Sequence, residues 1–298
     1  MNTLFVLLGA TAVGKTDVAI TIAQSLNCPV ISADSRQLYK ELRIGTAVPP
    51  PDVLQTVRHY FIATRSVTDY YSASMYENEA LKLISELHPA YPNLLLCGGS
   101  MLYIDAVCNG IDEMPTITDD VRRALRQQFD CEGLDGILAE LQRSDPDYFN
   151  EVDKKNYRRV IHAVELCRMT GMPYSRLRTH IIKTRPFRII KLGLERDRQE
   201  LYERINARVD TMIRDGLVRE AQDLYPLRGL NALNTVGYKE LFAYFDGACS
   251  IDEAIDKIKS NTRCYARKQM TWFHRDPSIN WFHPDDTCAM LKLLNTAG

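Results

Sequence analysis

The sequence contains no apolar run that approaches the roughly 20 residues of a membrane-spanning helix. Its N-terminal apolar run, residues 4–8, has no basic flank and is followed by a glycine-rich turn. That pattern predicts a buried strand and not a signal peptide. We therefore expect a cytoplasmic protein with no membrane partner.

The sequence also lacks the cysteine spacing of a metal site. Its eight cysteines include no Cys-x-x-Cys pair, and no pair of histidines accompanies them at zinc-finger spacing. Most of them lie in apolar surroundings. We expect reduced structural thiols.

Net charge is nearly absent, at −1, but charge is unevenly distributed. Residues 154–191 contain eleven Lys or Arg and a single acid, Glu165, which leaves the rest of the chain at −11. Residues 259–275 contain five Lys or Arg, no acid, and the aromatic residues Tyr265, Trp272 and Phe273. A basic segment is usually a solvated face. Segregation this strong instead favours a polyanion-binding surface, because neutralisation of phosphates dominates affinity for nucleic acid.

The first third of the chain alternates between strand and helix patterns. Apolar runs at 4–8, 29–34 and 93–97 predict strands, and residues 17–26 and 77–87 predict helices. This alternation is typical of an α/β fold with a parallel sheet covered by helices on both faces. Ligands bind at the carboxyl ends of such strands, so the loops after Gly9, Asp34 and Gly98 should meet at one crevice.

The pattern becomes helical after Pro115. Helices are predicted at 119–129, 134–142 and 156–170, the last ending at Gly171, and the next strand is predicted at 187–194. Helices then dominate residues 197–273, and a last short strand is expected at 279–282. We predict a core domain of residues 1–117 and 185–298, with a helical insertion at 118–184.

One motif carries a strong chemical signal. Residues 9–16 match the P-loop pattern G-x-x-x-x-G-K-[ST] in full and lie between a predicted strand and a predicted helix. Backbone N–H groups of such a loop surround phosphate oxygens, Lys15 adds a positive charge, and Thr16 can ligate Mg²⁺. The motif predicts phosphate binding without identifying the phosphate.

Two features that the sequence lacks narrow the class of phosphate-binding protein. The strand at 94–97 ends in Gly98-Gly99-Ser100, without the Mg²⁺-holding acid of a motor-type ATPase, and no arginine finger can be assigned. A small-molecule kinase and a transferase that uses another diphosphate both remain open. Asp34 should face the P-loop, where its carboxylate could accept a proton or help to hold Mg²⁺. A turn or helix cap is the alternative role for it.

Further motifs follow the P-loop in order: Asp34-Ser35-Arg36-Gln37-Leu38-Tyr39, Ile44-Gly45-Thr46-Ala47, Tyr71-Ser72-Ala73, Gly98-Gly99-Ser100-Met101-Leu102-Tyr103, residues 159–165, Val236-Gly237-Tyr238 and Arg267-Lys268-Gln269-Met270-Thr271-Trp272. Over almost its whole length the chain resembles the bacterial tRNA dimethylallyltransferases. The resemblance implies a P-loop NTPase-like fold with a helical insertion. It also implies transfer of a dimethylallyl group from dimethylallyl diphosphate to N6 of the adenosine just 3′ of the anticodon.

The resemblance also implies roles for individual residues. Asp34 would be the general base for N6, Ser100 would orient the diphosphate or the adenine, and Lys15 and a nearby arginine would neutralise the leaving diphosphate. Thr16 would hold Mg²⁺. The diphosphate would be bound by Gly9, Ala10, Thr11, Ala12, Val13, Gly14, Lys15 and Thr16.

The implied partner is the anticodon stem-loop of tRNA, bound by a monomer. The matching positions for tRNA contacts are Asp34, Ser35, Arg36, Gln37, Ser100, Arg122, Arg158, Arg159, Val160, Ile161 and His162. For Tyr103 and Trp272, core packing and prenyl packing are both open.

Four positions depart from the family pattern. Val48 stands where lysine is usual, Ser100 replaces threonine, His162 stands where arginine is common, and Val164 replaces leucine. The changes at 48 and 162 could weaken or redirect contacts with tRNA. Two other hypotheses remain: a small-molecule or nucleotide kinase on the same core, and a non-catalytic RNA-binding module with an inactive P-loop.

Overall fold

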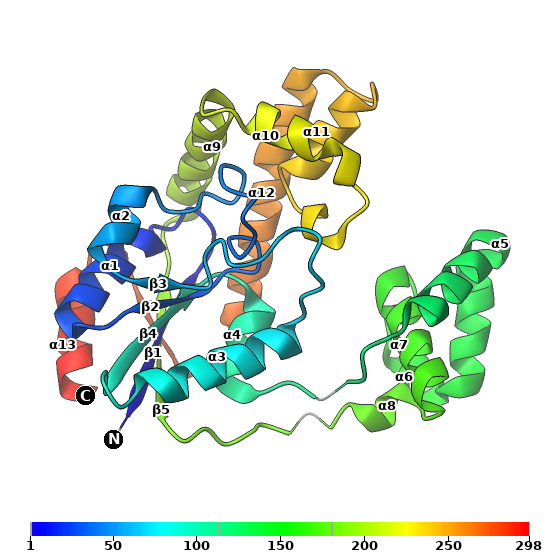
Figure 1. Ribbon diagram of the computed structural model, residues 1–298, viewed down its shortest axis with the longest axis horizontal. Helices are drawn as coiled ribbons and strands as arrows, with labels where there is room; N and C mark the ends of the chain where they lie inside the picture. Colours follow the sequence, from blue (N-terminus) through cyan, green and yellow to red (C-terminus); the bar gives the residue numbers. More distant parts are fainter. Residues whose placement is uncertain (1, 113, 180, 298) are drawn as a thin grey trace. The chain divides into compact units, whose positions relative to one another are not determined.

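The computed structural model describes residues 2–112, 114–179 and 181–297 (Figure 1). The chain divides into two compact units, residues 1–109 with 184–298, and residues 110–183. The second unit begins eight residues before the predicted boundary at 118. The boundary lies at 110 because α4 (Met101–Asn109) ends there, and Gly110 follows it with a φ of +81°.

The first unit is built on one parallel sheet of six strands. The strands are β1 (Thr3–Gly9), β2 (Val30–Ala33), β3 (His59–Tyr60), β4 (Asn93–Gly98), β5 (Arg188–Leu194) and β6 (Ile279–Phe282), in the order β3-β2-β4-β1-β5-β6. The predicted α/β class and the predicted strands are confirmed. The edge strand β3 was not predicted, because two residues are too few to show a strand period.

The central strand β1 is buried along its whole length because helices cover both faces of the sheet. Phe5 and Leu7 pack with α1 (Lys15–Leu26), α9 (Arg198–Arg214) and α13 (Thr287–Ala297). Leu4, Val6 and Leu8 pack with α3 (Ala73–Leu87) and α4 on the other face (Figure 1). Helix α12 (Ile251–Phe273) contributes Ala266 to the first layer and Phe273 to the second.

A third apolar cluster holds loops of the first unit in place. It is formed by helices α9, α10 (Leu217–Leu224), α11 (Tyr238–Phe245) and α12, together with Tyr39, Leu42 and Val67 from the segment between β2 and α3. The 3₁₀ turns Tyr225–Leu227 and Asn231–Leu233 lie between α10 and α11, and the short helix α2 (Pro51–Thr56) precedes β3. This cluster fixes the segment that follows Asp34.

The second unit is entirely helical in the residues described. It contains α5 (Asp119–Ser144), α6 (Pro146–Glu151), α7 (Tyr157–Thr170) and α8 (Tyr174–Leu177) around a core that includes Leu125, Ile137, Leu141 and Val164. The two helices predicted at 119–129 and 134–142 are parts of α5, which is interrupted at Gly133, where φ is +68°. Helix α7 ends at Gly171 as predicted, with the glycine in the left-handed conformation.

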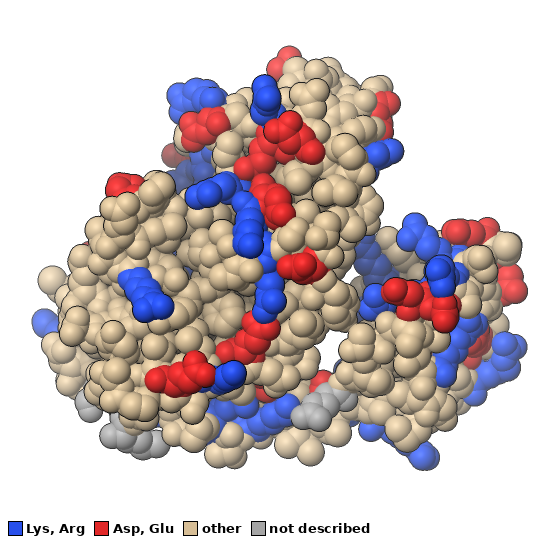
Figure 2. All heavy atoms as spheres, in the orientation of Figure 1, with Lys and Arg blue, Asp and Glu red and all other residues tan. Residues whose placement is uncertain are grey.

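The basic segment is less available to a polyanion than its sequence indicates. Among the described residues, the cations of the segment that pair with acids outside it include Arg168 with Glu140, Arg178 with Glu151, Arg185 with Glu77 and Lys191 with Asp276. Figure 2 shows basic and acidic side chains interspersed over the visible surface of both units. A surface that binds polyanions therefore has to use the other cations of the segment.

All eight cysteines are free, as expected for structural thiols. Burial raises the pKa of the Cys28 thiol to about 12 and that of Cys97 to about 11, which keeps both protonated at neutral pH. Within residues 2–112, 114–179 and 181–297, no helix combines the length and the apolar character needed to cross a membrane.

A buried ion pair fixes the chain where it returns to the sheet unit. The Arg185 guanidinium donates to Glu77 Oε1 at 2.7 Å and to the carbonyls of Ala106 and Val107 at 2.6 and 2.9 Å. Its side chain is 8% exposed and that of Glu77 is 4% exposed. The contact ties the segment before β5 to α3 and α4.

We predict that Glu77→Ala lowers the free energy of unfolding by about 3–5 kcal/mol, because it leaves the buried Arg185 charge without its counter-ion. Urea unfolding of the full chain, followed by circular dichroism, measures the change. Glu86→Ala is the matched control, because Glu86 lies on the same helix in an exposed pair with Lys82 and should change stability by less than about 1 kcal/mol. Equal effects of the two substitutions would contradict the prediction.

Candidate functional site

A pocket of about 710 Å³ lies at the carboxyl ends of β1, β2 and β4. The P-loop, residues 34–37 and residues 97–99 all line it, which confirms the predicted crevice. Residues 45–47, helices α9 and α12, and residues 234–239 complete its wall.

The P-loop has the backbone of a tight turn between β1 and α1. Ala12 and Gly14 have φ values of +64° and +110°, and the second of these favours glycine. Gly9 is required for a different reason. A Cβ atom there would lie 2.8 Å from the Leu194 carbonyl oxygen on β5. Gly14 therefore permits the turn of the loop, and Gly9 permits the close packing of the loop against β5.

Lys15 is held against its own loop. Its Nζ donates to the carbonyl oxygens of Gly9 and Ala10 at 3.0 and 2.7 Å. Burial lowers the pKa of Lys15 to about 8, although Cys97 and the Asp34 carboxylate oppose this shift. The positively charged Arg208 lowers it further. An anion bound at the loop would restore the stability of the ammonium form.

Three side chains from later in the chain fix the P-loop. Arg204 Nε donates to the Ala12 carbonyl at 3.0 Å, and Arg196 Nε donates to the Val13 carbonyl at 2.9 Å. Gln269 Oε1 accepts from the Thr11 N–H at 2.9 Å. None of these three contacts was predicted from the sequence. Gln269 belongs to one of the family motifs, but neither spacing nor composition indicates what its side chain touches.

Asp34 caps a turn and also lines the pocket, while its part in the chemistry stays a prediction. Its Oδ1 accepts from the backbone N–H groups of Arg36 and Gln37 at 2.9 and 3.2 Å, so it caps the turn after β2. It also lines the pocket. Among the described residues no donor is hydrogen-bonded to its other oxygen, Oδ2, which leaves that oxygen available as a proton acceptor.

The pocket has an excess of positive charge. Its lining includes five cations and two acids: Lys15, Arg36, Arg204, Arg208, Lys239, Asp17 and Asp34. Burial lowers the pKa of the Arg208 guanidinium, and the Asp34 carboxylate opposes that shift. Arg204 and Arg208 both line the pocket and are candidates for the nearby arginine that the resemblance implies without naming. An excess of cations in a partly enclosed site favours an anionic ligand.

Ser100 connects two of the loops at the site. Its Oγ accepts from the Ser35 N–H at 2.8 Å and donates to Ser35 Oγ at 3.1 Å, and the residue is 8% exposed. These bonds hold the end of β4 against the turn that carries Asp34. The serine hydroxyl makes them without the methyl group of threonine. Direct contact of Ser100 with a substrate stays a prediction.

Glu220 on α10 fixes the loop at 43–47. Its Oε2 accepts from the N–H groups of Arg43 and Ile44, and its Oε1 accepts from the N–H of Gly45 and the hydroxyl of Tyr238, at 2.6 to 3.0 Å. Glycine is needed at 45 because a Cβ atom there would lie 2.6 Å from the Tyr238 hydroxyl. This role of Glu220 was not predicted from the sequence either. Val48 follows the loop and does not line the pocket.

The residues predicted to contact tRNA from the insertion differ in exposure. Arg158, Arg159 and His162 are exposed on α7, whereas Val160 is fully buried in the core of the second unit and Ile161 packs against that core. The Val160 side chain is therefore unavailable to a ligand. Val160 lies on the apolar face of α7, which packs into the core of the unit, whereas the basic residues lie on the opposite, exposed face.

His162 and Arg122 each lie near an acid of their own helix. His162 Nδ1 is 3.6 Å from a carboxylate oxygen of Glu165 on α7. Arg122 is 4.0 Å from Asp119 at the start of α5. Both pairs join residues three positions apart, and neither removes the side chain from solvent.

Tyr103 and Trp272 belong to the core. Tyr103 is 7% exposed and stacks on Tyr76 with ring centroids 4.2 Å apart. Trp272 packs on the same side of the sheet and donates from Nε1 to Asp105 Oδ2 at 2.8 Å. Neither residue lines the pocket, so core packing accounts for both.

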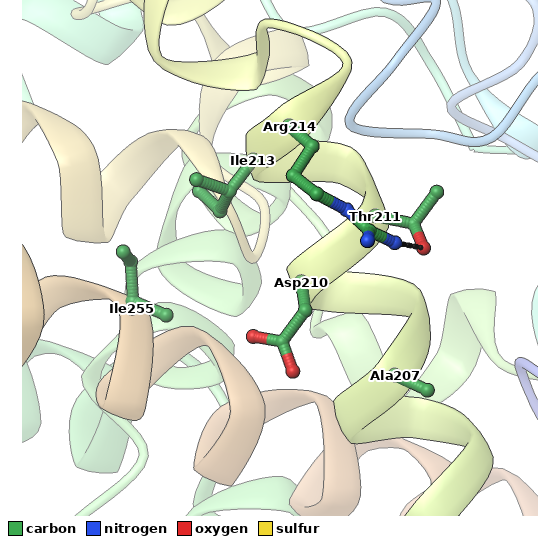
Figure 3. A pocket seen from close by; sticks show the side chains of 6 residues that line it. All are labelled: Ala207, Asp210, Thr211, Ile213, Arg214 and Ile255. Carbon is green, nitrogen blue, oxygen red and sulfur yellow. Dashed lines mark hydrogen bonds between the residues drawn. The ribbon is translucent and has the colours of Figure 1, made fainter.

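A second hollow of about 510 Å³ lies on a different side of α9 (Figure 3). Asp210 at its edge pairs with Lys259 at 2.6 Å, and Arg214 donates to the Thr211 hydroxyl at 2.9 Å. Its lining contains no P-loop residue, and the carboxylate of Asp210 is already paired with Lys259. The chemistry therefore belongs to the first pocket.

Comparisons with known proteins identify the family of the chain. The protein-family model described as IPP transferase matches residues 37–276. The tRNA dimethylallyltransferase 2 of Parabacteroides distasonis is 59% identical over 295 residues, which cover 99% of each chain. The protein of the same name from Porphyromonas gingivalis is 57% identical over 294 residues, 98% of each chain.

Solved structures agree as well. The tRNA isopentenylpyrophosphate transferase of Bacillus halodurans is 32% identical with a TM-score of 0.74, over 99% of this chain and 96% of that one. A eukaryotic dimethylallyltransferase acting on tRNA has a TM-score of 0.80 over 95% of this chain and 74% of that one, and at 23% identity it bears on the fold alone. The resemblance noted in the motifs is confirmed: this chain belongs to the IPP transferase family and is a prenyltransferase of the tRNA dimethylallyltransferase type.

Proposed function

We propose that this enzyme transfers a dimethylallyl group from dimethylallyl diphosphate to N6 of the adenosine 3′-adjacent to the anticodon of tRNA and releases diphosphate. The observation that carries the proposal is that one pocket is lined by a P-loop and by Asp34, whose Oδ2 is available. The P-loop would bind the leaving diphosphate, and the carboxylate would accept the proton of the attacking amine.

Asp34 acts as the general base. The N6 amine attacks C1 of the dimethylallyl group, a C–N bond forms, and the C–O bond to the diphosphate breaks with its electron pair. One proton of N6 passes to the Asp34 carboxylate. The base is needed because the N6 lone pair is delocalised into the adenine ring, which makes the amine a weak nucleophile. The turn that Asp34 caps fixes the direction of its carboxylate.

The cations of the pocket stabilise the leaving group. As the C–O bond breaks, negative charge accumulates on the diphosphate. Lys15 of the P-loop and Arg204 and Arg208 of helix α9 line the pocket and would neutralise that charge. Charge stabilisation by groups already in position is usually the largest contribution to catalysis. The N-terminal end of α1, which begins at Lys15, adds its partial positive charge.

The residues present fit a magnesium ion held mainly by the substrate. Among the described residues no group of three or more His, Cys, Asp or Glu could hold a metal by itself. Mg²⁺ commonly takes one or two protein ligands together with substrate phosphates and water. Thr16 would supply its hydroxyl and Asp17 or Asp34 a carboxylate, since all three line the pocket. Such an ion would neutralise charge on the diphosphate.

The acceptor adenosine has to leave its base stack to reach a pocket of this kind. Residues 34–37 and 45–47 form the wall that would meet it, and the exposed cations of α7 would contact the phosphates of the anticodon stem-loop. The proposed site needs no residue from a second copy of the chain, because the P-loop, Asp34 and Arg208 line one pocket.

Transfer of labelled dimethylallyl to an anticodon stem-loop tests the proposal. We expect Asp34→Asn to lower kcat by about 10²-fold or more, because a positioned base contributes that much, and to leave the affinity for dimethylallyl diphosphate nearly unchanged. Lys40→Ala, a nearby exposed substitution outside the pocket lining, is the control. Hydrolysis of ATP without label transfer would support the kinase alternative and overturn the proposal.

The low pKa of Lys15 predicts a pH dependence of donor binding. The ammonium loses its proton as the pH rises through about 8, and a bound diphosphate should raise that pKa. Affinity for dimethylallyl diphosphate should therefore fall by up to about tenfold per pH unit above the free pKa. In the unbound protein, the destabilising contribution of Lys15 should diminish between pH 8 and 10.5, because in that range the unfolded chain binds the Lys15 proton more tightly than the folded chain does.

Calorimetry without RNA measures the affinity, and NMR of the protein with ¹³C-labelled lysine measures the titration. Lys15→Met identifies the signal and should abolish this part of the pH dependence. A Lys15 signal that titrates above pH 10 in the free protein would show that the prediction is wrong.

The exposed arginines of α7 predict a salt-dependent interaction with RNA. Replacing both Arg158 and Arg159 with alanine should lower the slope of log affinity against log salt by about 2, because two RNA phosphates would no longer be neutralised. Filter binding of the anticodon stem-loop at several salt concentrations measures the slope. Arg168→Ala is the control on the same helix, because Arg168 is bound to Glu140. An unchanged slope in the double variant would show that the RNA does not contact Arg158 and Arg159 and binds another surface.

A further inference from the structure

The side-chain amide of Gln269 fills the space between the P-loop and the carboxyl end of β4. Gln269 is 2% exposed. Its Oε1 accepts from the Thr11 N–H at 2.9 Å, and its Nε2 donates to the Gly99 carbonyl at 2.8 Å. Both ends of the amide are therefore bonded to backbone of the site.

The geometry around Gly99 shows how tightly this space is filled. A Cβ atom on Gly99 would lie 2.5 Å from Gln269 Nε2, 3.3 Å from the Gly9 carbonyl oxygen and 3.6 Å from Lys15 Nζ. The amide therefore lies beside the first residues of the P-loop and close to the lysine that meets the phosphates. Glycine at 99 is needed for this close approach.

Helix α12 keeps Gln269 in this place. Three residues before it, Ala266 packs into one layer of the core, and four residues after it, Phe273 packs into the other. The backbone that carries the amide is thus held on both sides of the sheet. Moving the amide aside would break two hydrogen bonds and leave the buried Gly99 carbonyl without its donor.

In P-loop proteins that bind triphosphates, free backbone N–H groups surround the phosphates, and the lysine reaches the outer two. The Mg²⁺-holding acid of a neighbouring strand lies on the same side. Here the Thr11 N–H is bonded to Gln269, and β4 ends in Gly98-Gly99 beside the amide. The place for an outer phosphate, between the start of the loop and β4, is occupied.

We propose that Gln269 limits this P-loop to two phosphates and is the residue that excludes triphosphates from it. The inference rests on the proposed function, in which the P-loop binds a diphosphate. It makes Gln269 a specificity-determining residue, which acts by occupying a phosphate position and not by touching the prenyl group or the adenosine.

Binding of inorganic diphosphate and tripolyphosphate tests the proposal. Isothermal titration calorimetry would be run with each anion on the full chain, at pH 7 with Mg²⁺. We expect the unchanged protein to bind diphosphate more tightly, although tripolyphosphate carries more charge. In Gln269→Ala the preference should shift towards tripolyphosphate by about tenfold or more, because the outer phosphate would meet an open space and a free Thr11 N–H.

Two further variants make the result specific. Gln269→Met keeps the volume of the side chain and should keep the preference near that of the unchanged protein. Lys268→Ala, the exposed neighbour on α12, should change both affinities together and leave their ratio unaltered. If Gln269→Ala does not fold, as judged by circular dichroism, Gln269→Ser empties the same space and carries the same expectation.

The possible outcomes distinguish a failure of the proposed diphosphate site from a failure of the role assigned to Gln269. If the unchanged protein binds neither anion, the diphosphate site of the proposed function is wrong and this inference is wrong with it. If it binds diphosphate but a folded Gln269→Ala or Gln269→Ser variant keeps the same preference, only the role of Gln269 is overturned. Tighter binding of tripolyphosphate by the unchanged protein would also overturn it.

Discussion

The ammonium group of Lys15 is partly buried at the P-loop, where it donates to two backbone carbonyls and makes no ion pair with the described residues. A buried cation without a counter-ion is costly, and the cost disappears when an anion binds. The surrounding structure keeps this arrangement in place. Arg196, Arg204 and Gln269 hold the loop from outside, and Arg208 adds further positive charge.

The acceptor side of the pocket is organised by carboxylates that bind backbone. Asp34 caps its own turn, and Glu220 binds three successive N–H groups of the loop at 43–45. Ser100 joins the first of these turns to the end of β4. Hydrogen bonds therefore fix two loops that lack regular structure. Proton transfer at a defined atom requires groups that are held in position in this way.

The basic segment shows why composition overestimates the number of cations that are available to bind a polyanion. Residues 154–191 are strongly basic as a sequence, yet Arg185 is a buried structural residue and Arg168, Arg178 and Lys191 have acidic partners. Their partners lie outside the segment, so a count along the chain cannot find them. The exposed arginines at 158 and 159 are the part of the segment that fits the original interpretation.

Features that depend on the order of neighbouring residues could be predicted without the structure. The P-loop motif, the strand and helix periods, the glycine that ends α7 and the position of Asp34 after β2 were all predicted, because each follows from neighbouring residues. The side chains that complete the site could not be predicted in this way, because they come from distant parts of the chain. Gln269 meets Thr11 across 258 positions, Arg204 meets Ala12 across 192 and Glu220 meets Gly45 across 175. Contacts at such separations are set by the packing of helices against the sheet, which no local pattern records.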